Sequence, residues 1–144
     1  MLFRSLVDRR FKDSRDLERL MAALERDVAS FIGVVNPHRL AERFLGDARE
    51  GARAPGGAVY LDGARADLPA LTQGSWDEST AVSVPLRVGK RNVGRLELGR
   101  RRDGTGFAPR ELECLQKTAD VVAAAITVSR QSHTVGAASL GRVS

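Results

Sequence analysis

The chain has 144 residues, of which 42% are hydrophobic and 28% are charged, and its formal net charge is +5. These values are typical of one soluble globular domain with a modest core, and no apolar run approaches the roughly 18 residues of a membrane-spanning helix. The single cysteine, Cys114, excludes an internal disulfide and a cysteine metal cluster. Because the first residues also lack a secretory signal, we expect a cytoplasmic protein.

The positive charge is concentrated in two segments. Residues 1–15 carry five basic and two acidic side chains, and residues 87–102 carry seven basic side chains and one acidic. The remainder of the chain is therefore net acidic, at −4. Such clustering suggests contact with an anionic surface, although solvated surface charge explains it more often.

The first predicted element is a helix of about 20 residues between Lys12 and Val35, capped by Asp13 or Ser14. Its apolar residues recur at alternating intervals of four and three, which defines a seam. The seam consists of Leu17, Met21, Leu24, Val28 and Phe31. It is expected to pack either against the last helix of the same domain or against a second copy of the chain.

A second helix is predicted from Asn36 and Pro37, which suit the cap and the first helical position, to Gly51. Residues 58–61 then read as a short strand. The pattern from 64 to 80 is weak. Within it, Leu68 and Leu71 fit a short strand, and residues 73–80 are expected to form a polar loop around Trp76.

Residues 82–98 alternate between apolar and polar side chains in two runs, which predicts an antiparallel hairpin with one buried face. A three-residue loop, Lys90–Asn92, keeps the apolar faces matched because it sets Leu86 opposite Leu96. The same register places Arg87 directly opposite Arg95 on the polar face. Like charges in that position repel unless an anion or an acidic side chain lies between them.

This polar face is the candidate ligand site. The residues expected to hold an anionic ligand or an acidic partner are Ser83, Arg87, Arg95 and Glu97, with Tyr60 and Trp76 as possible walls. The simpler alternative is a solvated face on which Glu97 bridges the two arginines diagonally.

The last predicted helix opens at Pro109 and has Glu111 in its first turn, where a carboxylate complements the helix dipole. It follows a turn at 103–106. Its apolar stripe consists of Leu112, Leu115, Ala119, Val122 and Ile126. The small and polar residues 131–144 are expected to form a disordered tail.

The order of hairpin, glycine-rich turn and long amphipathic helix over residues 81–126 resembles the closing half of a GAF domain. The residues that carry the resemblance are Val84, Pro85, Leu86, Gly94, Leu96, Phe107, Glu111, Leu112 and the run from Ala119 to Ile126. The resemblance extends over roughly residues 28–130. It implies an α+β fold, in which an antiparallel sheet carries the N- and C-terminal helices on one face, and a role as a regulatory sensor that often dimerises through those helices.

The opening residues resemble the linker between the membrane part and the cytoplasmic sensor of some bacterial histidine kinases. That resemblance implies a kinase-type output and places Arg4, Arg9 and Arg10 near the inner face of a membrane. The expected organisation is a basic linker and signalling helix at 1–35, a GAF-like domain at 36–130 and the tail at 131–144. The chain is expected to be either a piece of a longer protein or a stand-alone relative.

Only 20 residues separate Leu61 from Val82, where GAF domains usually place two strands and the helices that cover the ligand. A short strand and two turns nearly exhaust that length. We therefore expect a pocket that is shallow or absent, in which case the chain would be an interaction or dimerisation module that binds no small ligand.

Enzymatic chemistry is not expected. GAF-type methionine sulfoxide reductases use several cysteines, whereas Cys114 stands alone on the last helix. His38 and His133 are not placed to ligate haem or another metal, so neither a cofactor nor a metal is expected. Nucleic-acid binding through Arg91 and 100–102 is a further alternative, which is disfavoured because residues 81–102 contain no aromatic side chain on which a base could stack.

Overall fold

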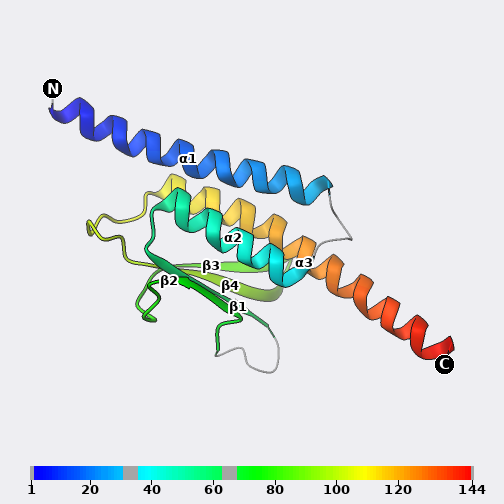
Figure 1. Cartoon of the computed structure of the whole chain (residues 1–144). Helices are drawn as coiled ribbons and strands as arrows, with labels where there is room; N and C mark the ends of the chain where they lie inside the picture. Colours follow the sequence, from blue (N-terminus) through cyan, green and yellow to red (C-terminus); the bar gives the residue numbers. More distant parts are fainter. Residues whose placement is uncertain (1, 31–35, 63–67, 144) are drawn as a thin grey trace.

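The computed structural model describes the backbone of residues 2–30, 36–62 and 68–143, and side chains within 15–30, 36–62 and 68–130. Figure 1 shows the helices and strands of the described residues in chain order. They are α1 (Leu2–Ser30), α2 (Pro37–Ala52), β1 (Gly56–Leu61), β2 (Leu71–Gly74), β3 (Thr80–Val88), β4 (Arg91–Gly99) and α3 (Pro109–Val143). Over the described residues, no helix has the length and apolar character needed to cross a membrane.

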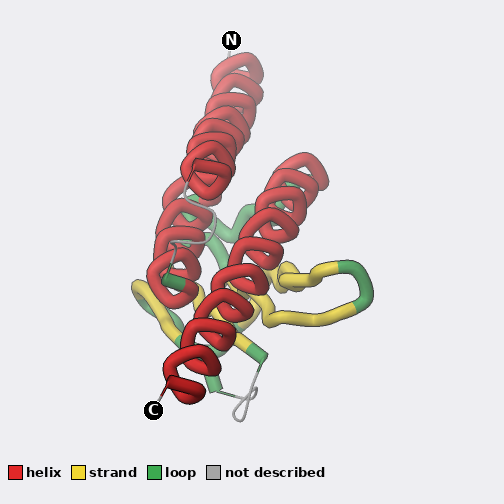
Figure 2. Tube along the Cα trace, turned by 90° about the vertical axis from the view of Figure 1, so that its right-hand side faces the viewer, coloured by secondary structure: helices red, strands yellow, loops and turns green. Residues whose placement is uncertain are grey.

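The strands form one antiparallel sheet in the order β2-β1-β4-β3, and α2 and α3 pack on one face of it. The predicted α+β class and antiparallel sheet are thus confirmed. Figures 1 and 2 show α1 lying across the outer side of α2 and α3, away from the sheet. The N-terminal helix therefore forms a third layer on the helical face, and α2 takes the place beside α3.

The predicted α1 seam is buried inside the chain. Leu17, Met21, Leu24 and Val28 are each at most 4% exposed and belong to the single core cluster, while Phe31 lies outside the described residues. On α3, the predicted stripe is fully buried from Leu115 to Ile126, but Leu112 at its start is 39% exposed. The intrachain alternative therefore accounts for the α1 seam.

A glycine lets α1 approach α2 closely. A Cβ atom built on Gly51 would lie only 2.7 Å from the Cα atom of Leu17, closer than real Cβ contacts come. Backbone meets backbone here, so no side-chain rotation could relieve the clash.

The start of α1 differs from the prediction, because the helix begins at Leu2 and the proposed caps Asp13 and Ser14 lie within it.

The start of α2 was predicted correctly. The Oδ1 atom of Asn36 accepts hydrogen bonds from the backbone N–H groups of His38 (2.9 Å) and Arg39 (3.4 Å), and Pro37 occupies the first turn. The helix ends at Ala52, one residue beyond the predicted end, and Arg53 caps it in the left-handed conformation.

The register of the β3–β4 hairpin was predicted wrongly by two residues. The loop is the two-residue turn Gly89–Lys90, in which Gly89 has φ +60°, and Leu86 pairs with Gly94 instead of Leu96. Val93 is an extra residue in β4, and this bulge restores the match between apolar faces that a two-residue loop alone would break. The predicted faces are therefore right although the predicted pairs are not.

Two other segments depart from expectation. Residues 71–74 form β2 beside β1, so the expected loop around Trp76 begins only after Gly74. The expected disordered tail is also corrected, because α3 continues without a break from Arg130 to Val143. The tail contains no proline and includes good helix formers such as alanine and leucine, and its small, polar composition does not by itself end a helix.

Candidate functional site

The polar face of the sheet carries a group of four side chains that we call the sheet-face cluster: Tyr60, Thr80, Arg95 and Glu97. Tyr60 and Arg95 are direct partners on β1 and β4, and the guanidinium carbon of Arg95 lies 3.8 Å from the centre of the Tyr60 ring. The Nε atom of Arg95 donates to Glu97 at 3.1 Å, and the Thr80 hydroxyl donates to the other oxygen of Glu97 at 3.2 Å. A cation–π contact and an ion pair thus hold Arg95 in place.

The cluster is electrically balanced. The side chain of Glu97 is 14% exposed and that of Arg95 is 39% exposed, so the carboxylate is the more deeply placed partner. An anion that approaches Arg95 therefore competes with a carboxylate already bound there. A ligand or a partner with both donor and acceptor groups matches this face better than a simple anion does.

The structure separates the two arginines that the sequence placed opposite each other. Arg87 pairs with Asn92, and Pro85 is the residue opposite Arg95, so the predicted Arg87–Arg95 pair was wrong. The cause is the two-residue turn and the bulge described above. Ser83 lies opposite Glu97, as part of the same polar face.

Trp76 does not join this cluster through any described contact. Its backbone lies against Gly56, where an added Cβ would be 2.8 Å from the Trp76 nitrogen. Gly56 and Tyr60 lie at opposite ends of β1 and are roughly 13 Å apart along the strand. The indole N–H of Trp76 is buried and has no hydrogen-bond partner among the described residues.

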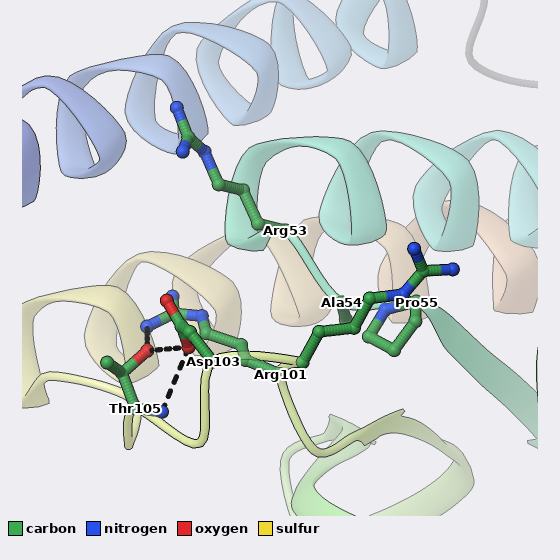
Figure 3. Close-up of a pocket in the computed structure, with 7 residues that line it drawn as sticks. Arg53, Ala54, Pro55, Arg101, Asp103 and Thr105 are labelled. Atoms are coloured by element: carbon green, nitrogen blue, oxygen red, sulfur yellow. Dashed lines mark hydrogen bonds between the residues drawn. The ribbon is translucent and has the colours of Figure 1, made fainter.

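Two hollows stand out in the described part of the chain. Neither is lined by any of residues 68–80, which are the described part of the segment where a shallow or absent pocket was expected. The first, which we call the arginine pocket, has a volume of about 380 Å³ and lies where the end of α2 meets the loop after β4 (Figure 3). It is lined by Arg53, Ala54, Pro55, Arg101, Arg102, Asp103 and Thr105. A shallow or absent pocket beneath 64–80 stays a prediction.

Arg101 is the best-fixed side chain of the arginine pocket. Its Nε atom donates to the Ala52 carbonyl at 2.7 Å, one terminal nitrogen donates to the Gly106 carbonyl at 3.0 Å, and the other forms an ion pair with Glu111. The guanidinium also lies 4.4 Å from the centre of the Phe107 ring. Arg101 thereby joins the last turn of α2 to the first turn of α3.

Glu111 contributes more than the favourable interaction with the helix dipole that its position predicts. Its second oxygen accepts the backbone N–H of Ala108 at 3.0 Å, which is half of a capping box for α3. In the turn before it, Asp103 accepts both the N–H and the hydroxyl of Thr105, and these bonds lower the pKa of the Asp103 carboxyl. This turn confirms the reading of residues 103–106.

The second hollow, which we call the helix groove, has a volume of about 420 Å³ and runs between α1 and α3. It is lined by Glu18, Met21, Ala22, Glu25, Arg110, Glu113, Cys114, Lys117 and Thr118. Arg110 donates to Glu18 at 2.7 Å and the Thr118 hydroxyl donates to Glu25 at 3.0 Å, so polar bonds join the two helices across the groove.

Cys114 in the helix groove is a poor nucleophile. Burial, together with the nearby Glu18 and Glu25 carboxylates, raises the pKa of its thiol to about 11, although the charges of Lys117 and Arg110 act in the opposite direction. A thiol with a raised pKa is almost entirely protonated at neutral pH, and only the thiolate reacts.

We therefore predict that Cys114 is alkylated by iodoacetamide far more slowly at pH 7.5 than the thiol of free glutathione. The rate should rise about tenfold per pH unit until pH approaches 11, because each unit increases the thiolate fraction tenfold. Mass spectrometry of the alkylated peptide measures this rate, and Cys114→Ser is the blank. A rate that levels off below pH 9 would contradict the raised pKa.

Over the described residues, no group of three or more His, Cys, Asp or Glu side chains is placed to hold a metal ion. The polar side chains of the sheet-face cluster and of both hollows are arginines, carboxylates and hydroxyls, to which the helix groove adds Lys117 and the protonated Cys114. This arrangement suits recognition of polar or anionic groups.

No family model matches the sequence, and no curated protein is similar to it. Solved structures do match the fold. The GAF domain of a Pseudomonas syringae pv. tomato protein assigned as a sensor histidine kinase superposes with a TM-score of 0.64 at 15% identity, over 95% of this chain and 99% of that one.

Two further structures agree. The GAF domain of an Acinetobacter phosphoenolpyruvate-protein phosphotransferase gives a TM-score of 0.61 at 11% identity, over 81% of this chain and 94% of that one. Free methionine-R-sulfoxide reductase from Neisseria meningitidis, in complex with its substrate, gives 0.65 at 16% identity, over 83% and 93%. The resemblance found in the sequence is thus confirmed at the level of the fold.

Proposed function

Since the chain has the fold of a GAF domain, we propose that it is a non-enzymatic regulatory domain of a signal-transduction protein. In this proposal, a change on the polar face of the sheet is passed to the helices. The observation that supports it most strongly is the position of α3, which packs on β3, β4, α1 and α2 and continues to Val143. One helix is therefore in contact with the sheet and with the outermost layer.

The contacts between the sheet-face cluster and α1 are continuous. Arg95 is the strand partner of Pro85, and the Pro85 carbonyl accepts a hydrogen bond from the side chain of Gln116 on α3 at 3.1 Å. Half a turn further along α3, Thr118 bonds Glu25 of α1. A shift of β3 at Pro85 would displace α3 and thereby the bond to α1, because packed helices adopt discrete arrangements.

Contiguity alone does not demonstrate coupling, so the test is a double-mutant cycle. We expect Arg95→Ala and Thr118→Val to be non-additive in the free energy of unfolding, by about 0.5 kcal/mol or more. The matched control combines Thr118→Val with Arg87→Ala, which removes an exposed arginine from the same polar face. Additivity of the first cycle, or equal non-additivity in both, would contradict the proposal.

We further propose that the chain forms a homodimer through the helix groove and not through the buried α1 seam. Glu113 and Lys117 are exposed on the groove side of α3, and neither forms an ion pair with another of the described residues. A two-fold axis near Leu115 would place Glu113 of one copy beside Lys117 of the other, twice. The same patch would then serve both copies, as an isologous interface requires.

Charge reversal tests this interface. Lys117→Glu is expected to weaken the dimer measured by sedimentation, since like charges would face each other across the axis. Combining it with Glu113→Lys should restore association, because the pair is then reversed but complementary. Failure of the double variant to recover, with both variants folded, would remove this interface from the proposal.

The output is proposed from the neighbours named above, which include a domain assigned to a sensor histidine kinase and one from a phosphotransferase. Figure 1 shows the N-terminus of α1 and the C-terminus of α3 at opposite ends of the molecule. Segments attached to the two ends would therefore leave in opposite directions. This arrangement suits a domain inserted between an input segment, such as a membrane-proximal linker, and a kinase-type output.

The second candidate is an interaction module that binds no small ligand. The balanced Arg95–Glu97 pair favours it, since no charge on the cluster is left uncompensated. Thermal-shift titration with small solutes that carry both donor and acceptor groups, such as free amino acids, separates the two candidates. A response that is present in the parent chain and lost in Arg95→Ala supports a ligand on the sheet face, whereas identical curves for both support the interaction module.

A further inference from the structure

The turn of the β3–β4 hairpin projects beyond the rest of the sheet. β1 pairs with β4 only over residues 94–98, so residues 87–92 form a two-stranded ribbon with no third strand beside it. We call this ribbon the basic finger. All six of its residues are exposed, and Figure 2 shows it at the right, extending away from the helices. The finger therefore adds little to the core and is open to contact with another molecule.

The charge of the basic finger is not compensated. Its cations are Arg87, Lys90 and Arg91, and it contains no acidic side chain. None of the three cations forms a side-chain hydrogen bond or an ion pair with another of the described residues, whereas Arg95 and Arg101 are each bound to a carboxylate. Like charges held this close repel one another, and an anionic partner would remove that repulsion.

The finger carries charge on both of its faces and an apolar side chain beside the turn. Arg87 pairs with Asn92 across the ribbon. Val88 pairs with Arg91 at the next position, so Arg87 and Arg91 lie on opposite faces. Lys90 lies in the turn between the strands, and the large apolar side chain of Val88 is 37% exposed. Only a partner that surrounds the finger would contact all of these side chains.

These features favour a concave, acidic protein surface as the partner. A flat bilayer would meet only the end of the ribbon, whereas a cleft reaches the cations on both faces. A nucleic acid would find no aromatic side chain for base stacking and would leave Val88 beside charged phosphates. Acidic side chains around an apolar centre match both the charge of the finger and the exposed valine.

The position of the finger indicates where such a partner would lie. β4 runs from the finger to Gly99, and the loop after it leads to the start of α3, so the finger lies at the end of the sheet away from that start. α3 packs on β3 and runs toward the end of the molecule where the finger lies (Figure 1). A protein attached to the C-terminal end of α3 would therefore be on the same side as the finger.

We propose that the basic finger docks in an acidic cleft of the output protein, with Arg87, Lys90 and Arg91 paired to carboxylates and Val88 at the centre of the contact. This docking rests on the regulatory function proposed above, whose partner it describes by its chemistry. The finger shares no residue with the sheet-face cluster or the helix groove. Arg87→Ala should leave the coupling between the sheet face and α1 unchanged, so the docking can fail while the regulatory proposal stands.

The probe is a synthetic peptide of repeated Glu-Glu-Leu triplets, a flexible acidic chain that can surround the finger. It is titrated into the full chain at low salt, and backbone amide shifts of residues 87–92 should change saturably. Replacing Arg87, Lys90 and Arg91 together by alanine should weaken binding about 10- to 100-fold, because each exposed ion pair contributes modestly. Val88→Thr should weaken binding about two- to fivefold, since a hydroxyl replaces a methyl group at the contact.

The matched control replaces Arg39, Arg100 and Arg102 by alanine, which removes the same charge from exposed positions outside the finger. It should bind the peptide within about twofold of the parent. Short duplex DNA and vesicles of phosphatidylserine and phosphatidylcholine are titrated at the same salt concentration as competing partners. The proposal would be overturned by the absence of saturable shifts in the parent, by equal weakening in the two triple variants, by no effect of Val88→Thr, or by tighter binding to DNA or vesicles than to the peptide.

Discussion

Replacing Arg101 by alanine is expected to lower the free energy of unfolding by about 3–5 kcal/mol, the cost of leaving one partner of a buried ion pair without the other. Glu111 is 6% exposed and would lose its cationic partner. The last carbonyl of α2 and the Gly106 carbonyl would lose their donor at the same time. Urea denaturation followed by circular dichroism measures the change.

Two further variants show whether the pair is responsible. Arg100→Ala removes an exposed arginine one residue away and should change stability by no more than about 0.5 kcal/mol. Arg101→Met combined with Glu111→Leu should be less destabilised than Arg101→Ala, because no charge is then left buried. If Arg101→Ala were as stable as Arg100→Ala, the junction between α2 and α3 would not depend on this ion pair.

The substitution of Gly51 by alanine is expected to destabilise the fold by about 1–3 kcal/mol, the usual cost of overpacking a core. The new methyl group would meet the Cα atom of Leu17, so α1 would have to move away from α2. Helix propensity alone predicts the opposite sign, since alanine is favoured over glycine in a helix by up to about 1 kcal/mol. The sign of the measured change therefore tells which effect dominates.

Gly46 on the same helix provides the matched control. A Cβ atom there would meet only the Gln73 side-chain amide, at 3.4 Å. Gly46→Ala should therefore be neutral or stabilising by about 0.5–1 kcal/mol. Thermal and urea unfolding of both variants give the comparison, and a Gly51→Ala variant that is stabilised like Gly46→Ala would show that α1 does not lie against α2 at Leu17.

The predictable parts of this fold are those fixed by local chemistry. Asn36 and Pro37 correctly predicted the start of α2. The short polar side chain of Asn36 accepts hydrogen bonds from the free N–H groups of the first turn, and Pro37 has no backbone N–H that needs a partner. The alternation of apolar and polar side chains in residues 82–98 predicted the buried face of the hairpin. The apolar residues from Leu115 to Ile126 predicted the buried stripe of α3, because residues three or four positions apart lie on the same face of a helix.

Other features depend on contacts that no local pattern encodes. The bulge at Val93 adds one residue to β4, and a single residue is enough to change every predicted cross-strand pair. The capping of α2 by Arg53 in a left-handed conformation has no glycine or asparagine signal. The arginine pocket was not predicted either, because its lining residues come together only when the end of α2 packs beside the loop after β4.

The sheet-face cluster was predicted in part. Tyr60, Arg95 and Glu97 do lie together on neighbouring strands, and their alternation with apolar residues was the signal. Thr80 was missed, since its bond to Glu97 depends on the irregular pairing at the start of β3. The other residues predicted for the site, Ser83, Arg87 and Trp76, form no hydrogen bond or ring contact with Tyr60 or Arg95 among the described residues.

The central proposal is that the sheet face acts on α1 through α3, and amide hydrogen exchange of Arg95→Ala against the parent chain measures this most directly. We predict faster exchange in β1 and β4 and also in residues 115–126 of α3 and 17–28 of α1, with no such change in Arg87→Ala. Faster exchange confined to the strands, with both helices as protected as in the parent, would contradict the proposal.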